Sequence, residues 1–160
     1  MIQAITETSF DIYVQTEDNR IDTSVASTQI RHLIKFTNDL DKSVHYAYGF
    51  SETIKDRFTD ISILYNITPD IYTGKTKLFP AGYWKYEVYE VSWTGTVTVS
   101  SGNAPATEDD VLTPPSGAKG IVQGLVTKGK MNLSEKDGTQ QVQYTQRQEP
   151  SGTNYIYYGQ

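Results

Sequence analysis

Two glutamates, Glu87 and Glu90, lie three residues apart inside the aromatic segment 82–93 (GYWKYEVYEVSW). A pair of carboxylates beside aromatic rings is the arrangement with which glycosidases protonate and attack a glycosidic bond. Side chains three positions apart on a regular strand point to opposite faces of the sheet, so the two carboxylates do not act on one bond. We therefore expect both glutamates to be solvated or to lie at an edge.

The chain has two histidines and no cysteine. Thiolate metal sites and Cys nucleophiles are excluded, and two imidazoles do not complete a zinc site, which requires three or four ligands. His32 lies among apolar residues of an alternating segment, which predicts a buried, hydrogen-bonded ring. No Gly-x-Ser-x-Gly elbow is present either. We expect no catalytic residue, no metal and no cofactor.

Two binding hypotheses remain for the polar and aromatic residues. Asp18, Asn19 and Asp22 form a small group of oxygen ligands, but the segment lacks the Asp-x-Asp-x-Asp-Gly order of a calcium loop, which favours a plain turn. The aromatic segment could offer a stacking platform for a sugar, which requires Trp84 or Trp93 to be exposed. Packing against a second sheet explains the same aromatic residues more simply.

The elements that must position these residues are strands. Apolar and polar residues alternate in segments 9–15, 28–37, 43–50 and 58–66, and strand-like segments follow at 75–79 and 82–93. Polar turns join them, and we expect the polar segment 51–57 to be a loop or one helical turn. No helix long enough for a parallel sheet is predicted. The pattern predicts an all-β fold, an antiparallel β-sandwich.

Composition changes after Thr98. Residues 100–119 are small, polar, acidic and rich in Pro, Gly and Ser, which predicts an exposed linker or long loop. We therefore divide the chain into a β-sandwich domain (1–99), this linker (100–119) and a C-terminal extension (120–160).

The C-terminal extension contains strand-like pieces at 120–126 and 130–135. A turn at Asp137-Gly138 and a returning strand at 140–146 would make a hairpin. About 40 residues with few large aliphatic side chains do not form a stable core alone. We expect the extension to dock on the sandwich or on a neighbouring molecule.

Charge and hydropathy exclude further classes. The chain has 14 basic and 19 acidic residues, a net charge of -5, without the clustered Lys and Arg of a nucleic-acid footprint. No apolar run reaches 18 residues, so no transmembrane helix is predicted, and the N-terminus lacks the pattern of a secretory signal. We expect no direct nucleic-acid partner and no membrane.

Three segments carry a resemblance to a known class of proteins. They are residues 30–39 (IRHLIKFTND), residues 57–61 (RFTDI) and residues 78–90 (LFPAGYWKYEVYE). These segments resemble small structural proteins of tailed-bacteriophage virions, in which a strand ending in Phe-Thr-Asn precedes an Arg-Phe strand and a Gly-Tyr-x-x-Tyr-Glu-Val strand. Residues 130–133, 142–144 and 155–158 are similar to the endings of such proteins. The resemblance covers about two-thirds of the chain.

The resemblance implies an immunoglobulin-like or related sandwich with an extended C-terminal arm or hairpin, and a non-enzymatic role in the virion. A minor capsid or decoration protein on the head shell is the first hypothesis, and a neck, connector or tail ring protein is the second. A carbohydrate-binding module is the alternative from another class. The expected partners are the major capsid protein or neck and portal components, with homo-oligomers in the particle.

Aromatic side chains dominate interface hot spots, which directs attention to those of the 82–93 segment and the extension. The candidate protein-interface residues are Trp84, Tyr86, Tyr144, Tyr155, Ile156, Tyr157 and Tyr158.

Overall fold

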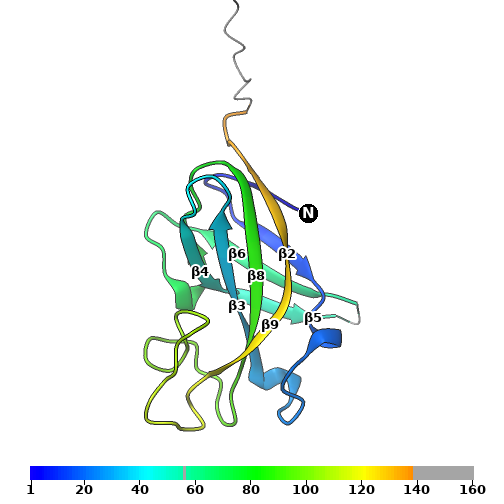
Figure 1. Ribbon diagram of the computed structural model, residues 1–160, viewed down its shortest axis with the longest axis vertical. Coiled ribbons are helices and arrows are strands. Elements are labelled where there is room, and N and C mark those ends of the chain that lie inside the picture. The colour runs from blue at the N-terminus through cyan, green and yellow to red at the C-terminus, as the bar shows by residue number, and fades with distance from the viewer. Residues whose placement is uncertain (56, 139–160) are drawn as a thin grey trace, which may run out of the picture.

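A computed structural model describes residues 1–55 and 57–138, and the regular secondary structure of this part of the chain is almost entirely β-strand (Figure 1). The strands are β1 (Ile2–Ile5), β2 (Phe10–Val14), β3 (Ile30–Asn38), β4 (Val44–Tyr48), β5 (Ser51–Ile54), β6 (Thr59–Tyr65), β7 (Lys75–Thr76), β8 (Gly82–Ser92) and β9 (Ile121–Ser134). Three short 3-10 turns interrupt the loops: η1 (Glu17–Asn19), η2 (Ser27–Gln29) and η3 (Ile71–Thr73). Within the described ranges, no helix has the length and apolar character needed to cross a membrane.

The strands form two sheets. The larger sheet has the order β1-β9-β8-β3-β4, and the smaller has the order β2-β6-β5, with β7 added beside β6. Neighbouring strands are antiparallel except for the pairs β1 with β9 and β6 with β7, which are parallel. The predicted all-β sandwich is therefore confirmed at the level of two mainly antiparallel sheets.

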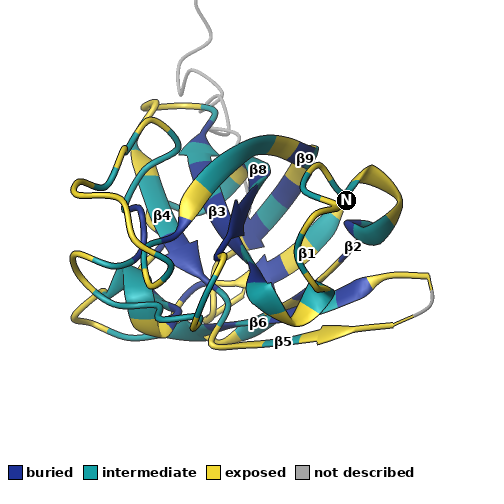
Figure 2. Cartoon of the chain, turned by 90° about the horizontal axis from the view of Figure 1, so that it is seen from below, coloured by how far each residue is buried: buried dark blue, intermediate teal, exposed yellow. Residues whose placement is uncertain are grey.

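The main core lies between the two sheets, where the smaller sheet contributes Ile12, Ile61 and Ile63. The larger sheet contributes alternate residues of β3 and β8, among them Phe36 and Trp84, both without exposed surface. Alternation at a period of two places these side chains on one face, as a half-buried strand requires. Figure 2 shows the buried residues gathered between the layers, while β5 stays largely exposed.

The strands predicted at 9–15, 28–37, 43–50, 58–66, 75–79 and 82–93 correspond to β2, β3, β4, β6, β7 and β8. One prediction was wrong, because the segment 51–57, expected to be a loop or helical turn, begins with strand β5. Its residues are polar because most of them face solvent at the edge of the smaller sheet. The strand Ile2–Ile5 was not predicted, since four residues give too short a pattern.

Residues 121–134 of the predicted extension form one continuous strand, β9, and not two short pieces. It pairs with β8 along its whole length and with β1 at its end, where Ile2 lies opposite Met131. The described part of the extension thus docks on the sandwich as an inner strand of the larger sheet. The chain then turns near Lys136 and Asp137, and the predicted returning strand 140–146 lies outside the described residues.

Where β8 pairs with β9, one tyrosine of β8 lies directly against a glycine of β9. Gly129 lies opposite Tyr86, and a Cβ atom at Gly129 would come within 2.6 Å of the Tyr86 hydroxyl oxygen. The Tyr86 ring therefore covers the glycine, a pairing that protects an otherwise bare stretch of sheet.

Gly129→Val should lower the free energy of unfolding by about 1–3 kcal/mol, because the new side chain displaces the Tyr86 ring. In a Tyr86→Ala background the same substitution should cost much less, since the space above residue 129 is then open. Urea unfolding of the four proteins gives the coupling free energy. Equal costs in both backgrounds would show that the Tyr86 ring does not restrict residue 129.

Candidate interaction surface

The outer face of the larger sheet is apolar at one end and is covered by the segment between β8 and β9. Leu33 and Tyr48 lie opposite each other on β3 and β4, and neither has exposed surface. They form a second cluster with Val91, Trp93 and Ala104, separate from the main core. Since Ala104 belongs to the 100–119 segment, that segment acts as a third layer over the sheet.

We call residues 94–120, which contain that segment, the covering loop. Polar contacts hold the covering loop on the larger sheet. The Tyr48 hydroxyl donates to the carbonyl oxygen of Pro105 at 2.7 Å. The Glu108 carboxylate accepts from both the Lys35 ammonium and the Tyr46 hydroxyl. Three side chains of β3 and β4 therefore hold two consecutive parts of the covering loop.

The ionisation of this contact follows from its partial burial. Burial acts to raise the pKa of the Glu108 carboxyl, but the hydrogen bonds from Lys35 and Tyr46 outweigh it, and the pKa is lowered overall. The pKa of Lys35 is raised, mainly by its hydrogen bond to Glu108. Burial and the Glu108 carboxylate together raise the pKa of Tyr46 to about 12. At neutral pH the contact thus joins an ammonium, a carboxylate and a neutral phenol.

The two glutamates of β8 face opposite sides, as expected from their spacing, but their surroundings differ. Glu87 forms an ion pair with Lys85 at 2.7 Å. The prediction that Glu90 is solvated or at an edge was wrong, because its side chain is buried and accepts from the backbone N–H groups of Ile21 and Asp22 at 2.9 and 2.7 Å. Two oriented amide donors replace the water that a buried carboxylate loses.

Asp22 extends this network. Its carboxylate accepts from the backbone N–H and the hydroxyl of Ser24 and from the hydroxyl of Ser92. The Ser24 and Ser92 hydrogen bonds lower the pKa of Asp22. The Asp18, Asn19 and Asp22 segment is therefore tied to β8 by hydrogen bonds, with η1 spanning Glu17–Asn19. Across residues 1–55 and 57–138, no group of three His, Asp or Glu side chains is placed to hold a metal ion.

The histidines have structural surroundings. His32 is buried, as predicted, and its Nδ1 lies 2.9 Å from a Glu52 carboxylate oxygen, while its backbone N–H donates to the other oxygen at 3.1 Å. Glu52 thereby joins β5 of the smaller sheet to β3 of the larger one. The His45 ring lies 5.8 Å from the Trp84 ring, centroid to centroid, and burial lowers the pKa of His45.

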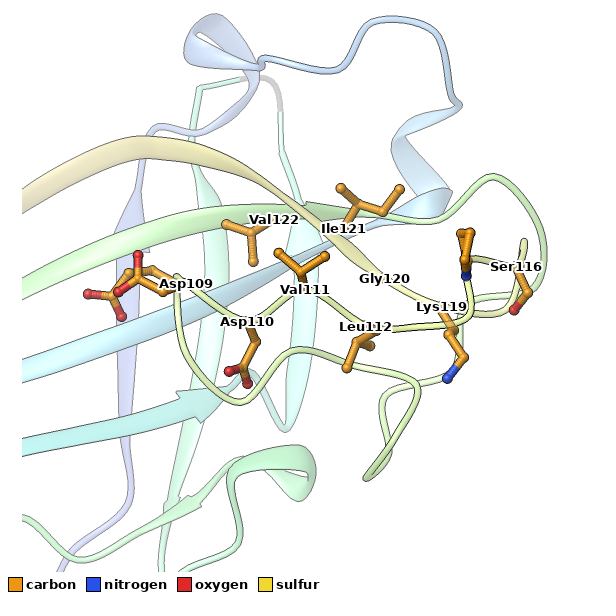
Figure 3. A pocket seen from close by; sticks show the side chains of 11 residues that line it. Asp109, Asp110, Val111, Leu112, Ser116, Lys119, Gly120, Ile121 and Val122 are labelled. Atoms are coloured by element: carbon orange, nitrogen blue, oxygen red, sulfur yellow. The ribbon is translucent and has the colours of Figure 1, made fainter.

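A pocket with a cavity volume of about 230 Å³ lies between the covering loop and the first residues of β9 (Figure 3). Apolar side chains supply much of its lining: Val111, Leu112, Pro115, Ile121 and Val122. In the view of Figure 3, Asp109 and Asp110 lie on one side of Val111, and Ser116 and Lys119 lie on the other. Val111 and Ile121 are 84% and 53% exposed, so this apolar surface has no cover within the described chain.

The residues predicted from sequence to form an interface are not brought together on the described surface. Trp84 is fully buried, and its Nε1 donates to the carbonyl oxygen of Pro80 at 3.1 Å. Tyr86 is partly buried against the main core and over Gly129. Trp93 is fully buried as well, so neither tryptophan offers an exposed platform for a sugar. Tyr144, Tyr155, Ile156, Tyr157 and Tyr158 lie outside the described residues.

Sequence reasoning missed the apolar residues of the pocket. Val111 and Leu112 were included in a polar linker, although two adjacent aliphatic residues between an acidic run and a proline pair are unusual in a solvated segment. These two aliphatic residues within an otherwise polar segment were the sequence signal that could have indicated the pocket.

Comparisons with protein-family models, with curated proteins and with solved structures gave no match. The function of the chain must therefore be argued from its own residues.

Glu90→Gln should lower the free energy of unfolding by about 2–3 kcal/mol, because an amide nitrogen would face one of the two backbone donors. Glu87→Gln is the matched control, on the same strand but on the opposite face, and should cost less than about 1 kcal/mol. Chemical denaturation measures both. A cost for Glu90→Gln as small as that of the control would contradict the buried-carboxylate network.

Acid should release the covering loop. Because the pKa of Glu108 is lowered in the folded state, its contact stabilises the protein above the ordinary value of 4.5 and is lost as the pH falls through the lower folded value. A Trp84→Phe variant leaves Trp93 as the sole tryptophan, under the covering loop. Its fluorescence should shift to the red and become quenchable by acrylamide below about pH 4.5.

The control for this titration is Glu108→Gln in the same Trp84→Phe background. The neutral amide has no charge to lose, so the acid-induced change in Trp93 emission should be reduced. An unchanged titration in this variant would assign the acid response to other carboxyl groups.

Proposed function

We propose that the chain is a non-enzymatic structural protein of a tailed-bacteriophage virion, most simply a minor capsid or decoration protein bound to the head shell. The resemblance of segments 30–39, 57–61 and 78–90 to such proteins supports the class. Within the described residues, two carboxylates with little exposed surface serve the fold: Glu90 binds backbone amides, and Glu52 binds His32. These side chains are thereby occupied in holding strands and loops together.

The sandwich is proposed to be of the immunoglobulin-like kind. In those domains one sheet joins the second, fifth and fourth strands, and the other joins the third, sixth and seventh with an added strand at its edge. Here β4 corresponds to the added edge strand, and β7 is set aside as a short addition. With both left out of the count, β2-β6-β5 and β9-β8-β3 follow the same order. The departure is β1, which pairs in parallel with β9 and not with β2.

One observation carries the proposal of an assembly role: the described chain leaves an apolar pocket uncovered at the end of the sandwich where β9 begins. The covering loop lies at the lower end in Figure 1, where β9 begins, and it supplies most of the residues that line the pocket. The strand β9 then runs to the upper end in Figure 1. The sequence continues beyond the described residues with 139–160, which include four tyrosines. A subunit of a particle needs a fixed body with more than one adhesive region, because it must contact more than one neighbour.

A carbohydrate-binding module is less well supported, because both tryptophans are buried and the described strands offer no exposed indole. A neck, connector or tail ring protein remains an alternative within the proposed class, since a sandwich with two adhesive ends suits a ring as well as a shell.

Quantitative mass spectrometry of purified virions against the major capsid protein tests the proposal and separates its two forms. Hundreds of copies per particle are expected for a decoration protein, and about a dozen would indicate a ring. Absence from particles would refute a virion role.

Removing residues 150–160 should reduce incorporation into particles while leaving the sandwich folded, because the deletion takes away Tyr155, Ile156, Tyr157 and Tyr158 but no described strand. Particle occupancy is measured by mass spectrometry, and circular dichroism of the purified variant checks the fold. Full occupancy by the shortened protein would exclude the C-terminal residues as an attachment element.

A further inference from the structure

The pocket at the covering loop has the size and lining of a site for protein side chains. Its cavity volume of about 230 Å³ lies below the range of roughly 300–1,000 Å³ that is usual for small-molecule ligands. Its lining includes Val111 and Ile121, both substantially exposed, with carboxylates of the covering loop beside them. An aromatic side chain with a polar tip suits such a site, because the ring fills the apolar part and the tip reaches the polar edge.

The chain itself supplies side chains of this kind in residues 155–158 (YIYY). Three of these four residues are tyrosines, the residue type with a large apolar ring and one hydroxyl that donates to a carboxylate. Asp110 accepts the Ala106 and Thr107 backbone N–H groups through one carboxylate oxygen, Oδ2, at 2.7 and 3.1 Å. Within residues 1–55 and 57–138, no hydrogen bond is made to its other oxygen, Oδ1, which is the acceptor that a phenol would use.

The direction of β9 decides which copy of the chain receives these residues. The 14 residues of β9 lead away from the pocket for roughly 45 Å, at about 3.3 Å per residue. From residue 139 to residue 155, a fully extended chain spans at most about 60 Å. To reach its own pocket, the segment would have to reverse and then run almost straight along the whole sandwich. A second copy placed end to end needs only a short part of that reach.

We propose that residues 155–158 of one copy dock in the covering-loop pocket of a second copy, with Val111 and Ile121 as the main apolar contacts. The inference rests on the proposed function, because it names the partner surface of a self-assembling virion subunit. The contact joins two different surfaces, so it is heterologous, and repetition leads to a ring or a filament.

Sedimentation velocity of the full chain tests the docking with two complementary variants. Val111→Arg blocks the pocket, and because Val111 is 84% exposed the substitution leaves the core intact. A triple variant with Tyr155→Ser, Tyr157→Ser and Tyr158→Ser removes the inserted rings. The wild-type chain should form oligomers that grow with concentration, and each variant alone should associate at least tenfold more weakly.

Mixing the two variants provides the sharpest outcome. The Val111→Arg chain keeps an intact C-terminal segment and the triple variant keeps an intact pocket, so an equimolar mixture should form one-to-one dimers and nothing larger. Leu40→Arg is the matched control, since Leu40 is also 84% exposed but lies in the turn between β3 and β4. This control should assemble like the wild type.

Three results would overturn the inference: a wild-type chain that is monomeric at all soluble concentrations, a Val111→Arg chain that assembles normally, or a mixture that remains monomeric. In the last case, docking of the segment within its own chain or elsewhere would be indicated. The measurement uses no particles, so its failure is distinct from absence of the protein from virions.

Discussion

Strands β3 and β8 carry apolar side chains on both faces, and the rest of the structure depends on this constraint. Phe36 and Trp84 point into the space between the sheets, while Leu33 and Val91 point the opposite way and are equally buried. A sheet with two apolar faces is not stable with one face in water, so a sandwich of two layers does not suffice. The covering loop supplies the missing layer. Its polar contacts with β3 and β4 hold it in place over the sheet.

The covering loop has two parts with different surroundings. Its first part, around Ala104 and Pro105, is buried and belongs to the fold. Its second part, around Val111, is exposed although it is apolar. What sets Val111 apart from a single exposed apolar residue is that it lines a pocket together with Ile121, which is exposed as well. The Glu108 contact with Lys35 and Tyr46 lies between the buried part and the exposed part.

Sequence reasoning recovered the strands whose alternation is long, such as β3, because one buried face imposes a period of two on nine consecutive residues. It failed where contacts between residues distant in the sequence determine the structure. The polar strand β5 is held by pairing with β6 and by the Glu52 bond to His32, which no pattern within 51–57 reveals. Glu90 is buried because amides distant in sequence converge on it. The pocket likewise combines residues 108–116 with the start of β9, and only the folded sheet brings them together.

The position of β9 has a consequence for biosynthesis. Ile2 pairs with Met131, so the first strand of the chain has its sheet partner only after the last described strand has been made. At translation rates of 5–20 residues per second, β1 waits roughly 6–26 s for its partner, and the β9 side of β8 stays unpaired for roughly 1–10 s. During that interval the 11-residue aromatic strand β8 exposes an open edge, which is a template for wrong pairing with other chains. A chain interrupted before residue 121 retains that edge permanently, so incomplete synthesis of this protein is a specific route to its aggregation.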